Sequence, residues 1–181
     1  CFFRSFEIFF RMKKQVNTCR VFSPYQSFSC LISSARINSI PPATSSCGRI
    51  LDAAAFLLGL CDERTYDGRP AMLLESHSFG PLELKPVIEE NVLMTTPLFE
   101  FLITNFDEDK KRLAATVQRY LAAGLYEIAK QYDKPIIFSG GCAYNTIISG
   151  YVMEKGVLVP KQIPAGDGGI SFGQIAYILK N

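Results

Sequence analysis

The amino-acid sequence predicts an α/β fold, because strand-like apolar runs alternate with segments of helical periodicity after residue 46. The clearest helix spans 108–132, where apolar residues recur at steps of three and four. The run 135–138 is typical of a short buried strand, and a Ser-Gly-Gly turn connects it to another helical pattern. With 48% hydrophobic and 20% charged residues in 181 positions, the chain has the composition of one globular domain or one lobe of a larger protein.

Residues 47–106 show a less regular pattern than the residues that follow them. A helix is expected over 47–60, after Pro41-Pro42, with the hydroxyls of 44–46 as N-cap candidates. Residues 62–70 form a predicted polar turn region. The segment 71–106 contains three prolines and short apolar runs such as 82–84, which suit strands.

The second half is more regular. After the 108–132 helix and the 135–138 strand, we expect a helix over 143–155, a strand at 157–159 and a final helix ending near residue 179. Such alternation is what an α/β layer requires.

The N-terminal segment 1–36 differs from the rest. Residues 1–46 carry six basic residues against one acidic residue, a net charge of +5, whereas the remainder carries a net charge of −3. A basic, phenylalanine-rich segment can bind RNA or an anionic membrane. We favour the alternative, a terminus without fixed structure or from a misassigned reading frame, because no periodicity is visible. The first residue, Cys1, leads us to expect a processed product or part of a longer reading frame.

Neither a membrane span nor a secretory signal is expected. The apolar run 1–10 contains two charges and is far shorter than the roughly 20 residues that cross a bilayer. It also lacks the order of regions that marks a signal peptide. A soluble, cytoplasmic protein without membrane or nucleic-acid partners is therefore predicted.

The cysteines do not form a recognisable metal or redox motif. Six cysteines are present at positions 1, 19, 30, 47, 61 and 142, without a Cys-x-x-Cys pair, and His77 is the only histidine. A structural zinc site needs four converging ligands, which are usually supplied from close pairs. We interpret the cysteines as reduced, buried thiols.

Two glycine turns are the candidate binding elements. Gly140 and Gly141 lie between a predicted strand and a helix, where backbone N–H groups favour a phosphate or another anion, although such a glycine pair is more often a plain tight turn. Asp167 lies among glycines at a helix start, where it can bind a metal, bind ribose hydroxyls or cap the helix. Asp52, in an apolar helix, either faces water or serves a site.

Four short segments carry motifs that together indicate one family. They are 44–60 (TSSCGRILDAAAFLLGL), 66–72 (YDGRPAM) with Leu74-Glu75, 139–145 (SGGCAYN) and 163–174 (IPAGDGGISFGQ). In order and spacing they resemble the C-terminal end of the HypF family, the carbamoyltransferases that mature [NiFe] hydrogenases. The resemblance covers roughly residues 37–181, and residues 1–36 show none.

The resemblance implies a fold and a reaction. The fold is one lobe of an actin-like ATPase (ribonuclease H-like) fold, a mixed sheet flanked by helices. In the family, carbamoyl phosphate and ATP give a carbamoyl-adenylate, and the carbamoyl group passes to the C-terminal cysteine of HypE. HypE is thus the implied protein partner, and ATP and carbamoyl phosphate are the implied substrates.

The resemblance also assigns roles to individual residues. Gly48 and Asp52 would contact the nucleotide ribose, Gly140 and Gly141 its phosphates, and Asn145 would approach the base. Asp167 would bind a divalent metal, either Mg, Fe or Zn. Catalytic residues stay unassigned.

This sequence departs from the family pattern in several ways. The histidines that complete the family's metal site are missing, as are its acylphosphatase-like, zinc-finger and adenylate-forming domains, so the chain is expected to be catalytically incomplete. Val117-Gln118 replaces a Phe-His pair. Two alternatives therefore stay open: a relative of the tRNA threonylcarbamoyl-transferases, and a truncated, inactive nucleotide-binding lobe.

Overall fold

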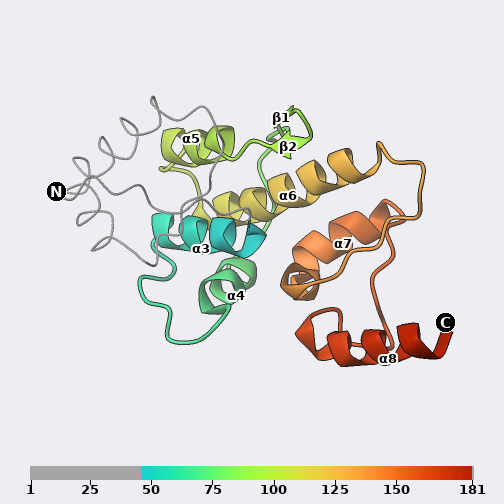
Figure 1. Cartoon of the computed structure of the whole chain (residues 1–181). Helices are drawn as coiled ribbons and strands as arrows, with labels where there is room; N and C mark the ends of the chain where they lie inside the picture. The colour runs from blue at the N-terminus through green and yellow to red at the C-terminus, as the bar shows by residue number, and fades with distance from the viewer. Residues whose placement is uncertain (1–45, 181) are drawn as a thin grey trace, which may run out of the picture.

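The computed structural model describes residues 46–180, and the N-terminal segment 1–36 lies outside the described residues. Figure 1 shows a mainly helical arrangement around one long helix, α6. The elements in chain order are α3 (Cys47–Leu57), α4 (Arg69–Ser76), β1 (Ile88–Glu89), β2 (Val92–Leu93), α5 (Thr96–Thr104), α6 (Lys110–Ala129), the 3₁₀ helix η1 (Gly141–Tyr144), α7 (Thr146–Glu154), the 3₁₀ helix η2 (Asp167–Gly169) and α8 (Ile170–Lys180).

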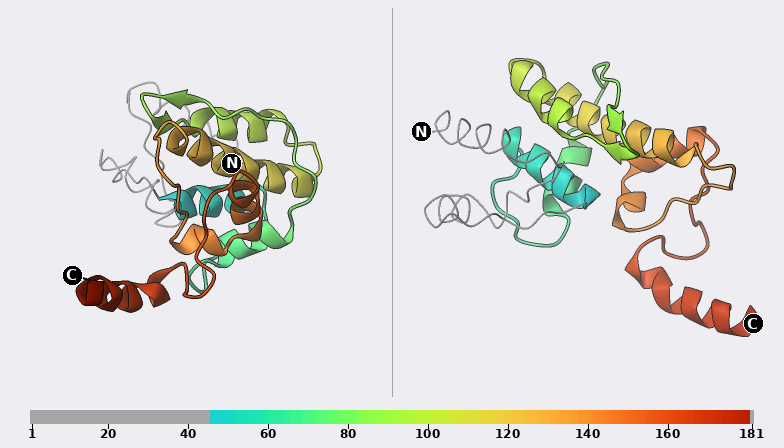
Figure 2. Two further views of the ribbon diagram at one scale, coloured as in Figure 1. Left: turned by 90° about the vertical axis from the view of Figure 1, so that its right-hand side faces the viewer. Right: turned by 45° about the horizontal axis from the view of Figure 1, so that its top comes forward.

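The core forms around α6. Its apolar face is buried through Leu113, Val117 and Leu121, and it contacts α3, α4, α5 and α7. Figures 1 and 2 show α3 and α4 on one side of α6, α5 on another side, and α7 along its C-terminal half. Asp109 caps the start of the helix, because its carboxylate accepts from the Lys111 N–H group at 2.9 Å. The predicted 108–132 helix is confirmed.

Helix α3 confirms the prediction of a helix over 47–60, although it ends three residues earlier. Ile50, Leu51 and Ala54 are among its buried residues, as their helical spacing predicts. Gly59 follows with a φ of 70°, a left-handed conformation that glycine adopts without steric cost and that terminates the helix.

The segment 71–106 corrects the prediction of strands at 82–84. It contains most of α4 and all of α5, and residues 82–84 belong to no strand. The Leu82 N–H group donates to Thr116 Oγ1 at 2.8 Å, so a side chain of α6 replaces the neighbouring strand as its partner. The prolines on both sides restrict the backbone further, and Leu82 and Leu84 pack against the core without a sheet.

A β-hairpin with two residues in each strand precedes α5. Its strands β1 and β2 pair antiparallel, and the turn residues Glu90 and Asn91 have φ angles of 49° and 63°. The hairpin packs closely on α6 at Gly124, where a Cβ atom would lie 2.3 Å from Leu93 Cδ1. Gly124 therefore allows the hairpin to approach the helix.

The predicted strands 135–138 and 157–159 pair, but over one position only. Ile137 and Leu158 form an isolated parallel bridge, flanked by hydrogen bonds from Phe138 N–H to Leu158 O (2.8 Å) and from Leu158 N–H to Ile136 O (2.9 Å). The strand pairing is therefore mixed: it is antiparallel in the hairpin and parallel at the bridge.

Helix α8 stands apart from the other helices in Figure 2. Every residue from 170 to 179 is exposed, including the apolar side chains of Phe172, Ile175 and Leu179. Among residues 46–180, no helix combines the length and the apolar character that crossing a lipid bilayer requires.

Candidate functional site

The two glycine turns named by the sequence lie against each other. The Gly140 N–H group donates to Ala165 O at 2.7 Å, and the Gly166 N–H group donates to Tyr144 Oη at 3.1 Å. A Cβ atom on Gly166 would lie 2.7 Å from the Tyr144 ring, so a larger residue there would displace the tyrosine. The turns at 139–145 and 163–169 therefore form one structural unit.

Gly140 and Gly141 form the start of this unit. Gly140 has a φ of 99°, which only glycine adopts without strain, and nothing would meet a Cβ atom at either glycine within 4 Å. The backbone N–H groups of Gly141 and Cys142, the first two of η1, have no hydrogen-bond partner within residues 46–180. Open N–H groups at such a turn are the donors that an anion requires.

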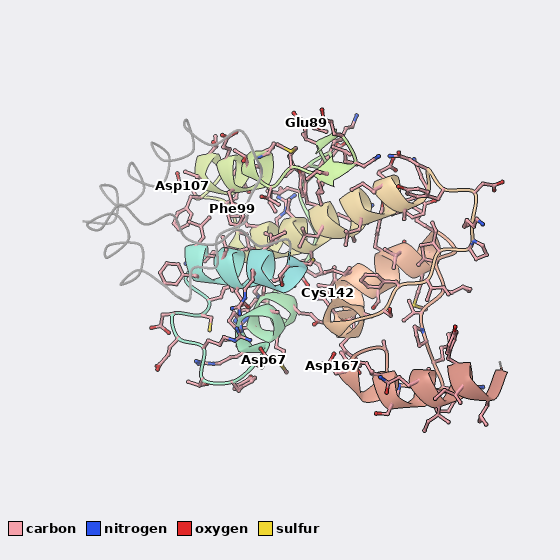
Figure 3. All side chains as sticks on the ribbon, viewed as in Figure 1. Asp67, Glu89, Phe99, Asp107, Cys142 and Asp167 are labelled. Atoms are coloured by element: carbon pink, nitrogen blue, oxygen red, sulfur yellow. The ribbon has the colours of Figure 1, made fainter. Side chains whose placement is uncertain are left out.

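The N-terminal end of α3 lies beside the first turn. Helix α3 contacts η1, and Figure 3 shows Cys142 close to the end of α3. Gly48 lies in the first turn of α3, with open space beyond Ser46 Oγ at 3.6 Å. Helix α3, which carries Gly48, therefore contacts the 3₁₀ helix that begins at Gly141.

Asp52 is buried rather than facing water. Its side chain is 6% exposed and pairs with Arg49 at 3.4 Å and with Arg64 at 3.9 Å. Burial raises the pKa of Asp52 above its usual value, although both guanidinium groups act in the opposite direction. Arg64 also pairs with Asp67, so the carboxylate belongs to a small ionic network. Sequence reasoning did not anticipate Arg64, because it follows the helix at no recognisable spacing.

Asn145 is also buried, and both polar ends of its side chain have protein partners. As the N-cap of α7, its Oδ1 accepts from the Ile148 N–H group at 2.9 Å. Its Nδ2 donates to Gln118 Oε1 on α6 at 2.7 Å. Gln118 in turn donates to Ser78 and to Ala114 O. The asparagine therefore fixes the turn to the core. An Asn directly before an apolar helical run was the signal for this role.

A second link holds the start of α7. Glu75, at the end of α4, accepts hydrogen bonds from the Thr146 N–H group at 2.8 Å and from Thr146 Oγ1 at 2.5 Å. The family motif included Glu75, but nothing in a single sequence paired it with a residue 71 positions away. A carboxylate at a helix N-terminus is favourable, and here it also ties α4 to α7.

Asp167 is exposed at the start of η2, and Figure 3 shows it at the beginning of the α8 segment. Within residues 46–180, no group of three or more His, Cys, Asp or Glu side chains converges as a metal site would require. The described residues therefore do not fit a complete divalent-metal centre.

The sequence matches a known protein family over most of its length. A family model described as the carbamoyltransferase Kae1-like domain, second subdomain, matches residues 8–174. The chain belongs to this family. The match begins within the segment 1–36, for which the motifs showed no resemblance. The division of the chain at residue 36 stays a prediction, because those residues lie outside the described part.

Relatives support the same family. A probable carbamoyltransferase HypF of Methanocaldococcus jannaschii is 42% identical over 77% of this chain and 20% of its own length. The carbamoyltransferase HypF of Rhodobacter capsulatus is 32% identical over 74% of this chain and 19% of its own length. The chain thus spans about a fifth of the length of these curated relatives.

Solved structures confirm the predicted fold class, an α/β lobe. The crystal structure of T. kodakarensis HypF superposes with a TM-score of 0.71 and 27% identity, over 84% of this chain and 22% of that one. A full-length HypF in the phosphate- and nucleotide-bound form gives a TM-score of 0.68 at 23% identity, over 99% of this chain and 26% of that one. The second likeness shows the fold alone.

Proposed function

We propose that this chain supplies the nucleotide-binding half of a carbamoyl-transfer site. The protein to which the site belongs would use carbamoyl phosphate and ATP to form a carbamoyl-adenylate, and would then carbamoylate the C-terminal cysteine of HypE during [NiFe] hydrogenase maturation. The carbamoyltransferase names of the relatives support the reaction class. A cytoplasmic location is part of the same proposal.

The observation that carries the proposal is the joining of the two glycine turns beside the N-terminal end of α3. Open backbone N–H groups of Gly141 and Cys142 provide donors for the phosphate of an adenylate. Gly48 offers close approach to the ribose. These donors belong to turns fixed by hydrogen bonds, so they require little rearrangement when an anion binds.

Asp52 and Asn145 take different parts in this proposal. Asp52 is the candidate for ribose contact, which requires its carboxylate to exchange an arginine partner for a hydroxyl. Asn145 is the candidate on the base side, and it also positions Gly141 by anchoring α7 to α6. No residue of the chain is assigned to the nucleophilic step. Donors for the phosphate stabilise the leaving adenylate when a thiolate attacks the carbamoyl carbon.

Asp167 is proposed as one ligand of a divalent metal, Mg, Fe or Zn, whose other ligands lie outside residues 46–180. A bound cation of this kind would supply charge neutralisation at the phosphate. Asp167 is exposed at the start of η2, so its carboxylate is accessible to a cation.

Calorimetric titration of the full chain with ATP and Mg²⁺ tests the proposal. We expect measurable binding that Asp52→Ala and Asn145→Ala each weaken at least about tenfold, a loss of about 1.4 kcal/mol. Asp109→Ala and Asn105→Ala are matched controls, because these residues cap or follow other helices and lie outside the two turns. Both controls should bind as the wild type does.

Circular dichroism of every variant separates lost binding from lost folding. A folded wild-type chain that does not bind ATP would overturn the nucleotide-binding proposal and favour an inactive lobe. If ATP binds and the full-length protein transfers a threonylcarbamoyl group to adenosine in tRNA instead of a carbamoyl group to HypE, the tRNA-modifying alternative replaces the proposed reaction.

A further inference from the structure

A network of polar side chains connects the end of α4 to the candidate site through the core. Its members are Ser78, just after α4, Gln118 on α6 and Asn145 at the start of α7. Helix α6 contacts both α4 and α7, and Figure 1 shows it between α5 and α7. Gln118 is fully buried, and Asn145 is 6% exposed. Because buried amides and hydroxyls require partners, such a network restricts each side chain to one arrangement.

The direction of these hydrogen bonds is set at the Ser78 end. The Ser78 hydroxyl donates to Leu74 O at 2.7 Å, so its only hydrogen is used and its oxygen accepts from Gln118 Nε2. Gln118 Nε2 also donates to Ala114 O at 3.1 Å. A reversed Gln118 amide would place its oxygen against that carbonyl oxygen. The Gln118 oxygen therefore faces Asn145 and accepts from Nδ2 at 2.7 Å.

The other end of the network requires the same orientation of Asn145. The Ile148 N–H group donates to Asn145 Oδ1 at 2.9 Å, which leaves the amide nitrogen of Asn145 for Gln118. The asparagine amide is thus held at its oxygen by α7 and at its nitrogen by α6. Loss of the Gln118 oxygen would leave one bond only, and the amide could then rotate.

Asn145 Nδ2 retains one donor. An amide nitrogen carries two hydrogens, and Nδ2 makes no hydrogen bond other than that to Gln118 within residues 46–180. The ring nitrogens of adenine are hydrogen-bond acceptors, which such a donor suits. The open backbone N–H groups of Gly141 and Cys142, earlier in the same turn, suit phosphate instead. The turn therefore has separate donors for two parts of a nucleotide.

We propose that Gln118 is a positioning residue that holds the Asn145 amide so that its second N–H group meets a ring nitrogen of a bound purine. This inference rests on the proposed function, because it requires a nucleotide at the turn 139–145. Gln118 acts on recognition of the base through Asn145. It does not act on the phosphate donors, because these belong to the backbone of a turn that the bond from Gly140 N–H to Ala165 O also holds.

Binding of two ligands to the full chain tests the assignment. ATP is titrated calorimetrically with Mg²⁺, and inorganic tripolyphosphate, which has no base, is measured by its competition with ATP. Gln118→Met keeps a flexible side chain of similar size and removes both polar ends. We expect this variant to bind ATP about fivefold more weakly, with the tripolyphosphate affinity within about twofold of the wild type. A role limited to stabilising the turn would weaken both ligands by the same factor.

Two further variants complete the test. Thr116→Val is the matched control, because Thr116 is also buried on α6 but accepts from Leu82 N–H, outside the network. It should leave both affinities unchanged. Ser78→Ala removes the acceptor of Gln118 Nε2 at the far end of the network, and should weaken ATP binding about twofold without affecting tripolyphosphate. If circular dichroism shows that Gln118→Met is not folded, Ser78→Ala decides the question.

The possible failures are distinguishable. Equal weakening of both ligands, or no change in either, would overturn the positioning role of Gln118 while ATP binding by the wild-type chain stands. If the folded wild-type chain does not bind ATP, the proposed function fails, and the assignment of Gln118 fails with it. Tripolyphosphate that does not compete with ATP would also overturn the assignment, because the phosphates would then lie away from the turn.

Discussion

Helices α7 and α8 follow similar turns, but α7 packs into the core and α8 is exposed. Each comes directly after a glycine turn and a short 3₁₀ helix, η1 before α7 and η2 before α8. Helix α7 buries Ile148 and Val152 against the core, whereas residues 170–179 of α8 are all exposed. Similar turns therefore do not determine where a helix packs. Burial and long-range polar contacts determine it.

The two turns differ in the same way. The first is fixed to the core by Asn145 through Gln118 and by Glu75 through Thr146. The second is tied to the first by two hydrogen bonds, from Gly140 N–H to Ala165 O and from Gly166 N–H to Tyr144 Oη. The first turn is therefore held by contacts with the core, whereas the second turn is held through its hydrogen bonds with the first.

The largest expected contrast comes from truncating one isoleucine in each helix. Ile148→Ala removes a fully buried side chain from α7 and should lower the free energy of unfolding by about 2–4 kcal/mol. Ile175→Ala, at a side chain that is 58% exposed on α8, should change it by less than about 0.5 kcal/mol. Urea unfolding of the two variants measures both values. Equal losses would show that α8 is buried in solution and would contradict the contrast between the two helices.

An intermediate effect is expected at the N-cap of α7. Asn145→Ala removes the acceptor for the Ile148 N–H group and leaves buried Gln118 Oε1 without its donor, so we expect a loss of about 1–3 kcal/mol. Asn105→Ala, which removes a half-buried amide bonded to Phe101 O, should cost less than about 1 kcal/mol. The same unfolding measurement compares them. A smaller loss at Asn145 than at Asn105 would contradict the anchoring role.

The smallest effect concerns the tie between the two turns. Tyr144→Phe removes the acceptor of the Gly166 N–H group from a side chain that is 57% exposed, so global stability should change by less than about 1 kcal/mol. Amide hydrogen exchange at Gly166 should nevertheless accelerate several-fold, because local opening becomes easier. Tyr132→Phe, at another exposed tyrosine, is the control and should leave this amide unchanged. Unaltered exchange in Tyr144→Phe would show that the second turn is held by other contacts.

The sequence predicted those parts of the fold that depend on local pattern. Helices α3 and α6 follow from apolar periodicity, and both were confirmed. Helices α4 and α5 were missed because Pro70 and Pro97 suggested interruption, whereas each proline lies in the first turn of its helix, where it needs no N–H partner. Local periodicity does not distinguish a proline that begins a helix from one that ends it.

The residues of the candidate site were also predicted only where they belong to a local sequence pattern. Motifs located Gly140, Gly141 and Asp167, because these residues stand in recognisable short runs. The pairing of Asn145 with Gln118 was not predictable. It joins the turn before α7 to α6, and a single sequence carries no record of such a contact.

The polar side chains on α6 have a consequence for how the chain reaches its native state. Thr116 Oγ1 accepts from Leu82 N–H, and Tyr120 Oη accepts from Val87 N–H and donates to Met94 O at 2.6 Å. These bonds close loops of 26 to 34 residues, so their entropy cost is met only once α6 is formed. The largely irregular connection between α4 and α5 therefore has no template of its own. Its shape depends on contacts with a helix that follows it in the sequence.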